Sequence, residues 1–69
     1  MNDDVFFNRF RRITDTKYPR RLGELSEKAN ISYESLQNYR HGHNYPTLPA
    51  LVALADALNV SIDWLCGRK

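Results

Sequence analysis

Hydrogen-bonding side chains recur at helical spacing in residues 33–41. At about 100° per residue, Leu36 and Tyr39 fall on one side of a helix and leave the opposite side to hydrogen-bonding groups. The members of that opposite side are Tyr33, Glu34, Gln37, Asn38 and His41. In a DNA major groove, a glutamine or asparagine amide can make two hydrogen bonds with adenine, a glutamate can accept from the amine of cytosine, and a tyrosine ring can pack against a thymine methyl group. The pattern therefore predicts a helix that could read base edges, with Gln37 as the principal reader.

The same pattern also fits the solvated face of an ordinary surface helix, which is the usual meaning of polar residues at this spacing. The segment just upstream favours the first interpretation. Leu22, Leu25 and Ala29 recur at i, i+3 and i+7, which predicts a short amphipathic helix. Asn30 tolerates the left-handed conformation at the end of that helix, and Ser32 suits the N-cap of the next. Two short helices joined by a tight polar turn are therefore expected.

The rest of the chain supplies the elements that hold these two helices. Phe6, Phe10 and Ile13 recur at i, i+4 and i+7, which predicts a first helix with Asp3 and Asp4 near its positive N-terminal end.

The segment after the polar helix begins with an irregular loop, residues 41–46, which contains glycine, asparagine and proline. Thr47 then caps a fourth helix that ends at Asn59, and Ser61 caps a short last helix through Leu65. The apolar stripe of the fourth helix is Leu48, Leu51, Leu54, Ala55 and Leu58. The sequence thus predicts an all-α, compact five-helix fold that forms one domain over residues 1–69.

Several short motifs follow one another in a fixed order after residue 19. They are Leu25-Ser-Glu-Lys-Ala29, Ile31-Ser32, Leu36, Gly42, Pro46-Thr47-Leu48 and the run from Leu54 to Leu65. In this order and spacing they resemble the lambda-repressor-like, Cro-type (XRE) helix-turn-helix DNA-binding family. The resemblance implies that the third helix enters the major groove, and that the loop residues His41, His43 and Asn44 contact the DNA backbone.

The chain departs from the family pattern at two places. The family often has a phosphate-binding glutamine where Leu22 stands. It also tends to pair an arginine late in the first helix with a glutamate at the end of the third, and the nearest positions here are Thr14 and Arg40. With no carboxylate expected beside it, Arg40 is predicted to be available for a phosphate.

Two arginines, Arg20 and Arg21, stand next to the predicted start of the first amphipathic helix of the pair. Tyr18-Pro19 predicts that this helix begins there, because proline is tolerated at the first helical position. Arg20 and Arg21 in a first turn would oppose the helix dipole at a cost of about 0.3–1 kcal/mol each, and a bound phosphate would reverse that penalty. We therefore expect both to contact the DNA backbone. The alternative is a pair of loop arginines ahead of a helix that begins later.

The charge of the chain is unevenly distributed. The net charge is only +2, but residues 9–41 hold eight basic and four acidic side chains, whereas residues 42–67 hold two acidic ones. A basic half favours a polyanionic partner. The single cysteine, Cys66, cannot form an internal disulfide, and the N-terminus lacks the features of a signal peptide, so a cytoplasmic location is expected. The composition, 42% hydrophobic and 26% charged, predicts no membrane segment.

Catalysis and metal binding find no support in the sequence. His41, His43 and the distant Cys66 are too few for a zinc site, and no nucleophile has a base at a plausible spacing. We therefore expect no enzyme activity, no cofactor and no small-molecule substrate.

The leading hypothesis is a sequence-specific transcriptional regulator of the phage-repressor type that binds a palindromic double-stranded DNA operator as a homodimer. Ile62, Trp64 and Leu65 could pack against a second copy, or Trp64 could instead close the core over the first helix. The alternative function is a protein-interaction module of the antitoxin or anti-repressor type on the same fold. The predicted DNA-binding residues are Arg20, Arg21, Ser32, Tyr33, Glu34, Ser35, Gln37, Asn38, Arg40, His41, His43 and Asn44.

Overall fold

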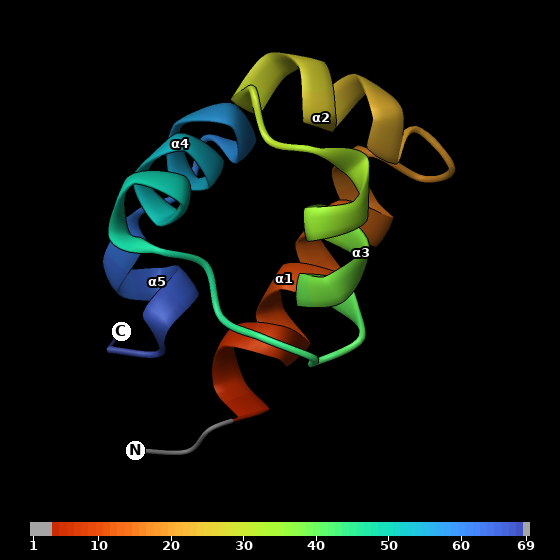
Figure 1. Ribbon diagram of the computed structural model, residues 1–69. Helices are drawn as coiled ribbons and strands as arrows, with labels where there is room; N and C mark the ends of the chain where they lie inside the picture. Colours follow the sequence, from red (N-terminus) through yellow and green to blue (C-terminus); the bar gives the residue numbers. More distant parts are fainter. Residues whose placement is uncertain (1–3, 69) are drawn as a thin grey trace.

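Helices make up the regular structure of the part of the chain described here, residues 4–68 of the computed structural model. In chain order they are α1 (Asp4–Lys17), α2 (Leu22–Ala29), α3 (Tyr33–Arg40), α4 (Leu48–Leu58) and α5 (Ile62–Cys66) (Figure 1). These residues include no strand, so the predicted all-α fold with five helices is confirmed. The predicted effect of Asp3 and of the Asp4 side chain on the first helix lies outside the described residues.

Local signals begin and end most of the helices as predicted. Ser32, Thr47 and Ser61 are the N-caps of α3, α4 and α5, and each hydroxyl oxygen accepts a hydrogen bond from the backbone amide three residues later. Asn30 and Asn59 end α2 and α4 in the left-handed conformation, with φ of 56° and 57°. Each cap satisfies backbone groups that a helix end leaves without an intrahelical partner.

The predicted start of the second helix at Tyr18-Pro19 is wrong, because α2 begins at Leu22. The amide of Tyr18 still donates to a carbonyl in the last turn of α1, 2.8 Å away, and its own carbonyl accepts from the amide of Arg21 at 3.0 Å. Pro19 therefore lies in a turn, where its missing N–H costs nothing, and Arg20 takes a positive φ of 60°. The alternative, in which the arginines precede a later helix, is correct.

The core draws on every helix. Phe10, Leu25, Leu36, Leu54, Leu58 and Leu65 are its fully buried hydrophobic side chains. Helix α1 packs against α3, α4 and α5, and α2 packs against α3 and α4, so α3 contacts both α1 and α2 (Figure 1). Aromatic rings join α1 to α3: the Tyr39 ring stands edge-on to Phe6 and Phe10, with centroids 6.4 and 6.1 Å apart. Burial of Leu36 and Tyr39 fixes which side of α3 faces outward.

The C-terminal aromatic residue lies against α1. Trp64 is half-buried, and the guanidinium of Arg9 lies 5.0 Å from the centroid of its ring. Leu65 is fully buried, and Ile62 is half-buried. This packing matches the interpretation in which Trp64 closes the core over the first helix.

Candidate nucleic-acid interface

The turn between α2 and α3 is fixed by its own hydrogen bonds. The hydroxyl of Ser26 donates to the carbonyl of Ile31, and the amide of Ile31 donates to the carbonyl of Ser26 at 3.1 Å. Three residues separate the two helices: Asn30 ends α2, Ile31 makes these two bonds, and Ser32 caps α3. The orientation of α3 relative to α2 is therefore set by short-range contacts.

The outward side of α3 carries the polar residues that the sequence pattern predicts there. Tyr33 is 51% exposed, Glu34 and His41 are also exposed, and Gln37 and Asn38 are half-buried along the flank of the helix. None of these five side chains belongs to the hydrophobic core. A surface with these donors and acceptors can form hydrogen bonds with a ligand without any change in the core.

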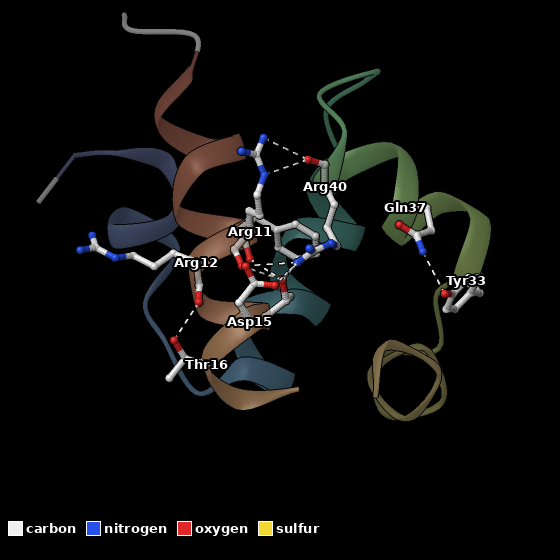
Figure 2. A network of polar contacts seen from close by, with 9 residues as sticks. Arg11, Arg12, Asp15, Thr16, Tyr33, Gln37 and Arg40 are labelled. Atoms are coloured by element: carbon white, nitrogen blue, oxygen red, sulfur yellow. Dashed lines mark hydrogen bonds and ion pairs between the residues drawn. The ribbon is translucent and has the colours of Figure 1, made fainter. Parts of the chain in front are cut away.

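Two members of this surface are hydrogen-bonded to each other. The Nε2 of Gln37 donates to the hydroxyl of Tyr33, 2.9 Å away and one helical turn earlier (Figure 2). Figure 2 also shows that the carbonyl oxygen of Gln37 is turned away from Tyr33. The amide is therefore oriented before any ligand binds.

The two serines at the start of α3 are partly occupied. The Ser32 oxygen accepts from the Ser35 amide at 3.1 Å, and the Ser32 hydroxyl donates to the Ser35 oxygen at 2.8 Å. Ser32 is exposed and Ser35 is half-buried. Their first role is thus to cap the helix. The groups still able to hydrogen-bond with a ligand are the Ser35 hydroxyl and the neighbouring backbone amides.

The guanidinium of Arg40 is already engaged within the domain, whereas the sequence predicted that it would be available for a phosphate. Its Nη1 lies 2.9 Å from Oδ1 of Asp15 and donates to the Thr14 hydroxyl at 2.5 Å (Figure 2). Only 24% of the Arg40 side chain is exposed. The expectation that no carboxylate stands beside Arg40 is therefore wrong. Thr14 was the position considered in the sequence, and the next residue, Asp15, is the one that pairs with Arg40. Compared with the ion pair that the resemblance implied, the charges are exchanged: here the carboxylate is on α1 and the guanidinium is on α3.

A second arginine strengthens this link between the helices. The guanidinium of Arg11 donates two hydrogen bonds to the carbonyl of Arg40, both 3.3 Å long, and Arg40 in turn donates to the carbonyl of Arg11 at 3.4 Å. We refer to Arg11, Thr14, Asp15 and Arg40 as the α1–α3 clamp. The sequence reasoning missed the first three as positioning residues. Their i, i+3, i+4 spacing on one face of α1 is the signal that could have indicated them.

Arg20 and Arg21 are both exposed beside the N-terminus of α2. The Arg21 guanidinium donates to the Lys17 carbonyl at 3.1 Å, lies 3.9 Å from a Glu24 oxygen and sits 5.9 Å from the Tyr18 ring centroid. For the Arg20 side chain there is no hydrogen bond or ion pair to another described residue. Arg21 is the N-cap residue of α2, but its side chain makes no capping bond.

A polar groove of about 370 Å³ lies between the end of α1, the start of α2 and the outward side of α3. Arg20, Gly23, Tyr33, Gln37 and His41 are among the residues that line it. An extra methyl group at Gly23 would meet no atom within 4 Å, so the first turn of α2 is open to approach from this side. The groove brings an exposed cation, the first amides of a helix and the Tyr33–Gln37 pair together.

The loop after α3 presents His41, His43 and Asn44, all of them exposed. The amide of His43 donates to the carbonyl of Asn38 at 2.9 Å, which holds the loop against the end of α3. Across the described chain, residues 4–68, no group of three or more histidine, cysteine or acidic side chains could hold a metal ion. Nor is any helix of that part both long and apolar enough to span a bilayer.

Some basic side chains of residues 9–41 form hydrogen bonds with other helices of the domain. Lys17 donates to the Leu58 carbonyl at the end of α4, 2.5 Å away, and Arg9 donates to the Trp64 carbonyl on α5. Together with Arg40, these side chains neutralise helix ends or carboxylates inside the domain. Arg20 and Arg21, beside the N-terminus of α2, and Lys28 in its last turn are exposed basic residues of the same half of the chain.

Known proteins with similar sequences are helix-turn-helix proteins or transcriptional regulators. A family model described as helix-turn-helix matches residues 21–65. A segment of 45 residues, 65% of this chain, is 44% identical to the cryptic phage CTXphi transcriptional repressor RstR of Vibrio cholerae serotype O1 and covers 40% of that protein. An equally long segment is 38% identical to the HTH-type transcriptional regulator ImmR of Bacillus subtilis and covers 35% of it. The chain thus matches well under half the length of these relatives. No solved structure gives a significant match.

Proposed function

This chain belongs to the helix-turn-helix family, and on that premise we propose that it is a sequence-specific DNA-binding transcriptional regulator, a repressor of the phage type. The observation that carries the proposal is the outward side of α3, where Tyr33, Glu34, Gln37 and Asn38 lie outside the core and are exposed or half-buried. The major groove is about 12 Å wide and admits one helix, whose side chains can then reach base edges. RstR is named as a transcriptional repressor, which supports the same direction of regulation.

In this proposal the base-reading side chains are those of α3. Gln37 and Asn38 each read an adenine, Glu34 accepts from a cytosine amine, and Tyr33 packs against a thymine methyl group. Ser32 and Ser35, at the N-terminus of α3, contribute amide and hydroxyl donors to a phosphate.

Backbone contacts come from the two sides of the reading helix. Arg20 and Arg21 flank the N-terminus of α2, where unpaired amides and the helix dipole favour an anion. On the other side, His41, His43 and Asn44 are exposed on the loop after α3. We do not retain Arg40 as a phosphate ligand, because the α1–α3 clamp already engages its guanidinium.

We further propose that the protein binds a palindromic operator as a homodimer, with the two α3 helices about 34 Å apart in successive major grooves. The exposed large hydrophobic side chains of the described residues are Tyr33, Tyr45, Leu48 and Val52. The last three cluster along the chain, on the loop before α4 and its first turns, and a second copy would cover them. Repression would follow from occupation of promoter DNA in the cytoplasm, and residues 1–69 would act as one domain.

The test is selection from a random DNA pool followed by a salt titration on the selected site. A dimer with about six phosphate contacts should weaken roughly 10³-fold in affinity between 50 and 200 mM salt. The selected sequences should be palindromic, and the mass of the complex should correspond to two copies per site. Failure to enrich any sequence, or binding that is insensitive to salt, would contradict the proposal and favour a protein partner for the same face.

A further inference from the structure

The hydrogen bond between Tyr33 and Gln37 bears on which base the proposed regulator would select. The two residues lie one turn apart on the outward side of α3, and Nε2 of Gln37 donates to the Tyr33 hydroxyl at 2.9 Å (Figure 2). Tyr33 is 51% exposed and is not part of the core. A hydrogen bond between two side chains at i and i+4 on a helix surface adds little to folding. Its more specific effect here is to orient the Gln37 amide.

The donors and acceptors of the pair can be counted. A primary amide has two N–H groups and one carbonyl oxygen. With one N–H given to Tyr33, Gln37 keeps one N–H and its Oε1, and these two groups match the N7 acceptor and the N6 amine of adenine. If the amide were rotated by 180°, both N–H groups would face away from Tyr33, and they would match the N7 and O6 acceptors of guanine. The orientation of the amide therefore separates adenine from guanine.

The Tyr33 hydroxyl can hold either orientation in isolation, because it is both a donor and an acceptor. In the proposed complex with DNA, a phosphate in the groove would decide between them. Arg20, Tyr33 and Gln37 line the same groove, and the Arg20 side chain makes no hydrogen bond or ion pair with the described residues. A phosphate held by Arg20 in this groove would accept the hydroxyl hydrogen of Tyr33. The hydroxyl would then have only lone pairs left for Gln37, which requires the N–H of the amide to face Tyr33.

We propose that Tyr33 is a positioning residue for Gln37, and that the Tyr33–Gln37 pair selects adenine over guanine at one base pair of the operator. The inference rests on the proposed function, since it assumes that α3 reads DNA. Beyond that function, the choice between adenine and guanine would depend on the hydroxyl of Tyr33, and the Tyr33 ring without its hydroxyl would not be sufficient for this choice.

The experiment uses the full chain and the site selected by the unmodified protein. The base pair read by Gln37 is first identified as the one at which Gln37→Ala loses discrimination. Affinities for the adenine site and its guanine variant are then measured for the unmodified protein, Tyr33→Phe, Gln37→Ala and the double variant. Tyr33→Phe should lower the adenine-to-guanine preference by about fivefold or more, because the amide becomes free to rotate. In the Gln37→Ala background the same change should leave the preference unaltered.

Asn38 supplies the matched control, because it lies on the same side of α3 and no side-chain bond links it to Tyr33. Discrimination at the base pair read by Asn38 should be the same in Tyr33→Phe as in the unmodified protein, and the melting temperature should be unchanged. Equal weakening on the adenine and guanine sites, or independent effects of the two substitutions, would overturn the inference while the proposed function stands. If the unmodified protein enriches no sequence, both fail together.

Discussion

Replacing Arg40 by alanine should destabilise the fold and only indirectly weaken DNA binding. The Arg40–Asp15 ion pair is partly solvated, with 24% and 61% of the two side chains exposed, and such pairs are worth about 0–1 kcal/mol. The bond to the Thr14 hydroxyl is more buried, since Thr14 is 1% exposed, and it adds about 1 kcal/mol. Thr14 keeps its own bond to the Phe10 carbonyl, so no buried group is orphaned. We expect a decrease of about 1–2 kcal/mol in the free energy of unfolding.

The assay is urea unfolding followed by circular dichroism, with DNA affinity measured in parallel on the same samples. A decrease of about 1 kcal/mol in a domain of this size lowers the melting temperature by about 4–8 °C. Asp15→Asn should cost only about 0.5 kcal/mol, because Asp15 is the more exposed partner.

An exchange of charges gives the internal control. Arg40→Glu alone sets two carboxylates side by side and should destabilise more than Arg40→Ala does. Adding Asp15→Arg should recover about 0.5–1 kcal/mol, as the ion pair is restored with opposite polarity. The reasoning is refuted if Arg40→Ala leaves stability unchanged but weakens binding to every DNA sequence and lowers the salt slope by about one. That result would make Arg40 the phosphate ligand predicted from the sequence alone.

Three further predictions concern the proposed interface. Gln37→Ala should cost about 1–3 kcal/mol on the selected operator and relax discrimination at one base pair, as measured by competition with single-base variants. Arg20→Ala should weaken all sequences alike and reduce the salt slope by about one, because one phosphate then has no cation beside it; a sequence-dependent weakening would contradict the assignment. Leu48 is 70% exposed in the first turn of α4. Leu48→Glu should lower the dimer fraction in sedimentation experiments without lowering the melting temperature, because a carboxylate suits a helix N-terminus, and an unchanged dimer fraction would remove Leu48 from the proposed dimer interface.

Features that depend on neighbours within about four residues were predictable from the sequence. The caps at Ser32 and Thr47 and the left-handed ending at Asn30 need only a side chain and the adjacent backbone. The start of α2 was not predictable, because Pro19 suits both a first helical position and a turn. The hydrogen bond from the Tyr18 amide back to α1 decides in favour of the turn.

The clamp was missed for a different reason. Asp15 and Arg40 are separated by 25 residues, and their contact depends on how α1 and α3 are rotated about their axes when the aromatic core packs. A sequence pattern gives the face of each helix but not that mutual rotation to within one residue. The polar face of α3, by contrast, follows from burial of Leu36 and Tyr39 on the opposite side. Its contacts with bases depend on a partner and stay a prediction.

The clamp holds α3 at its C-terminal end, and the Ser32 cap holds it at its N-terminal end, while the proposed base readers lie between these two points on the side that the core does not use. A change at Glu34 or Asn38 therefore leaves the contacts of the hydrophobic core in place. The DNA sequence that the proposed regulator recognises could therefore change by substitution at such positions, and the outward residues of one helix-turn-helix domain could be transplanted onto another without redesign of its core.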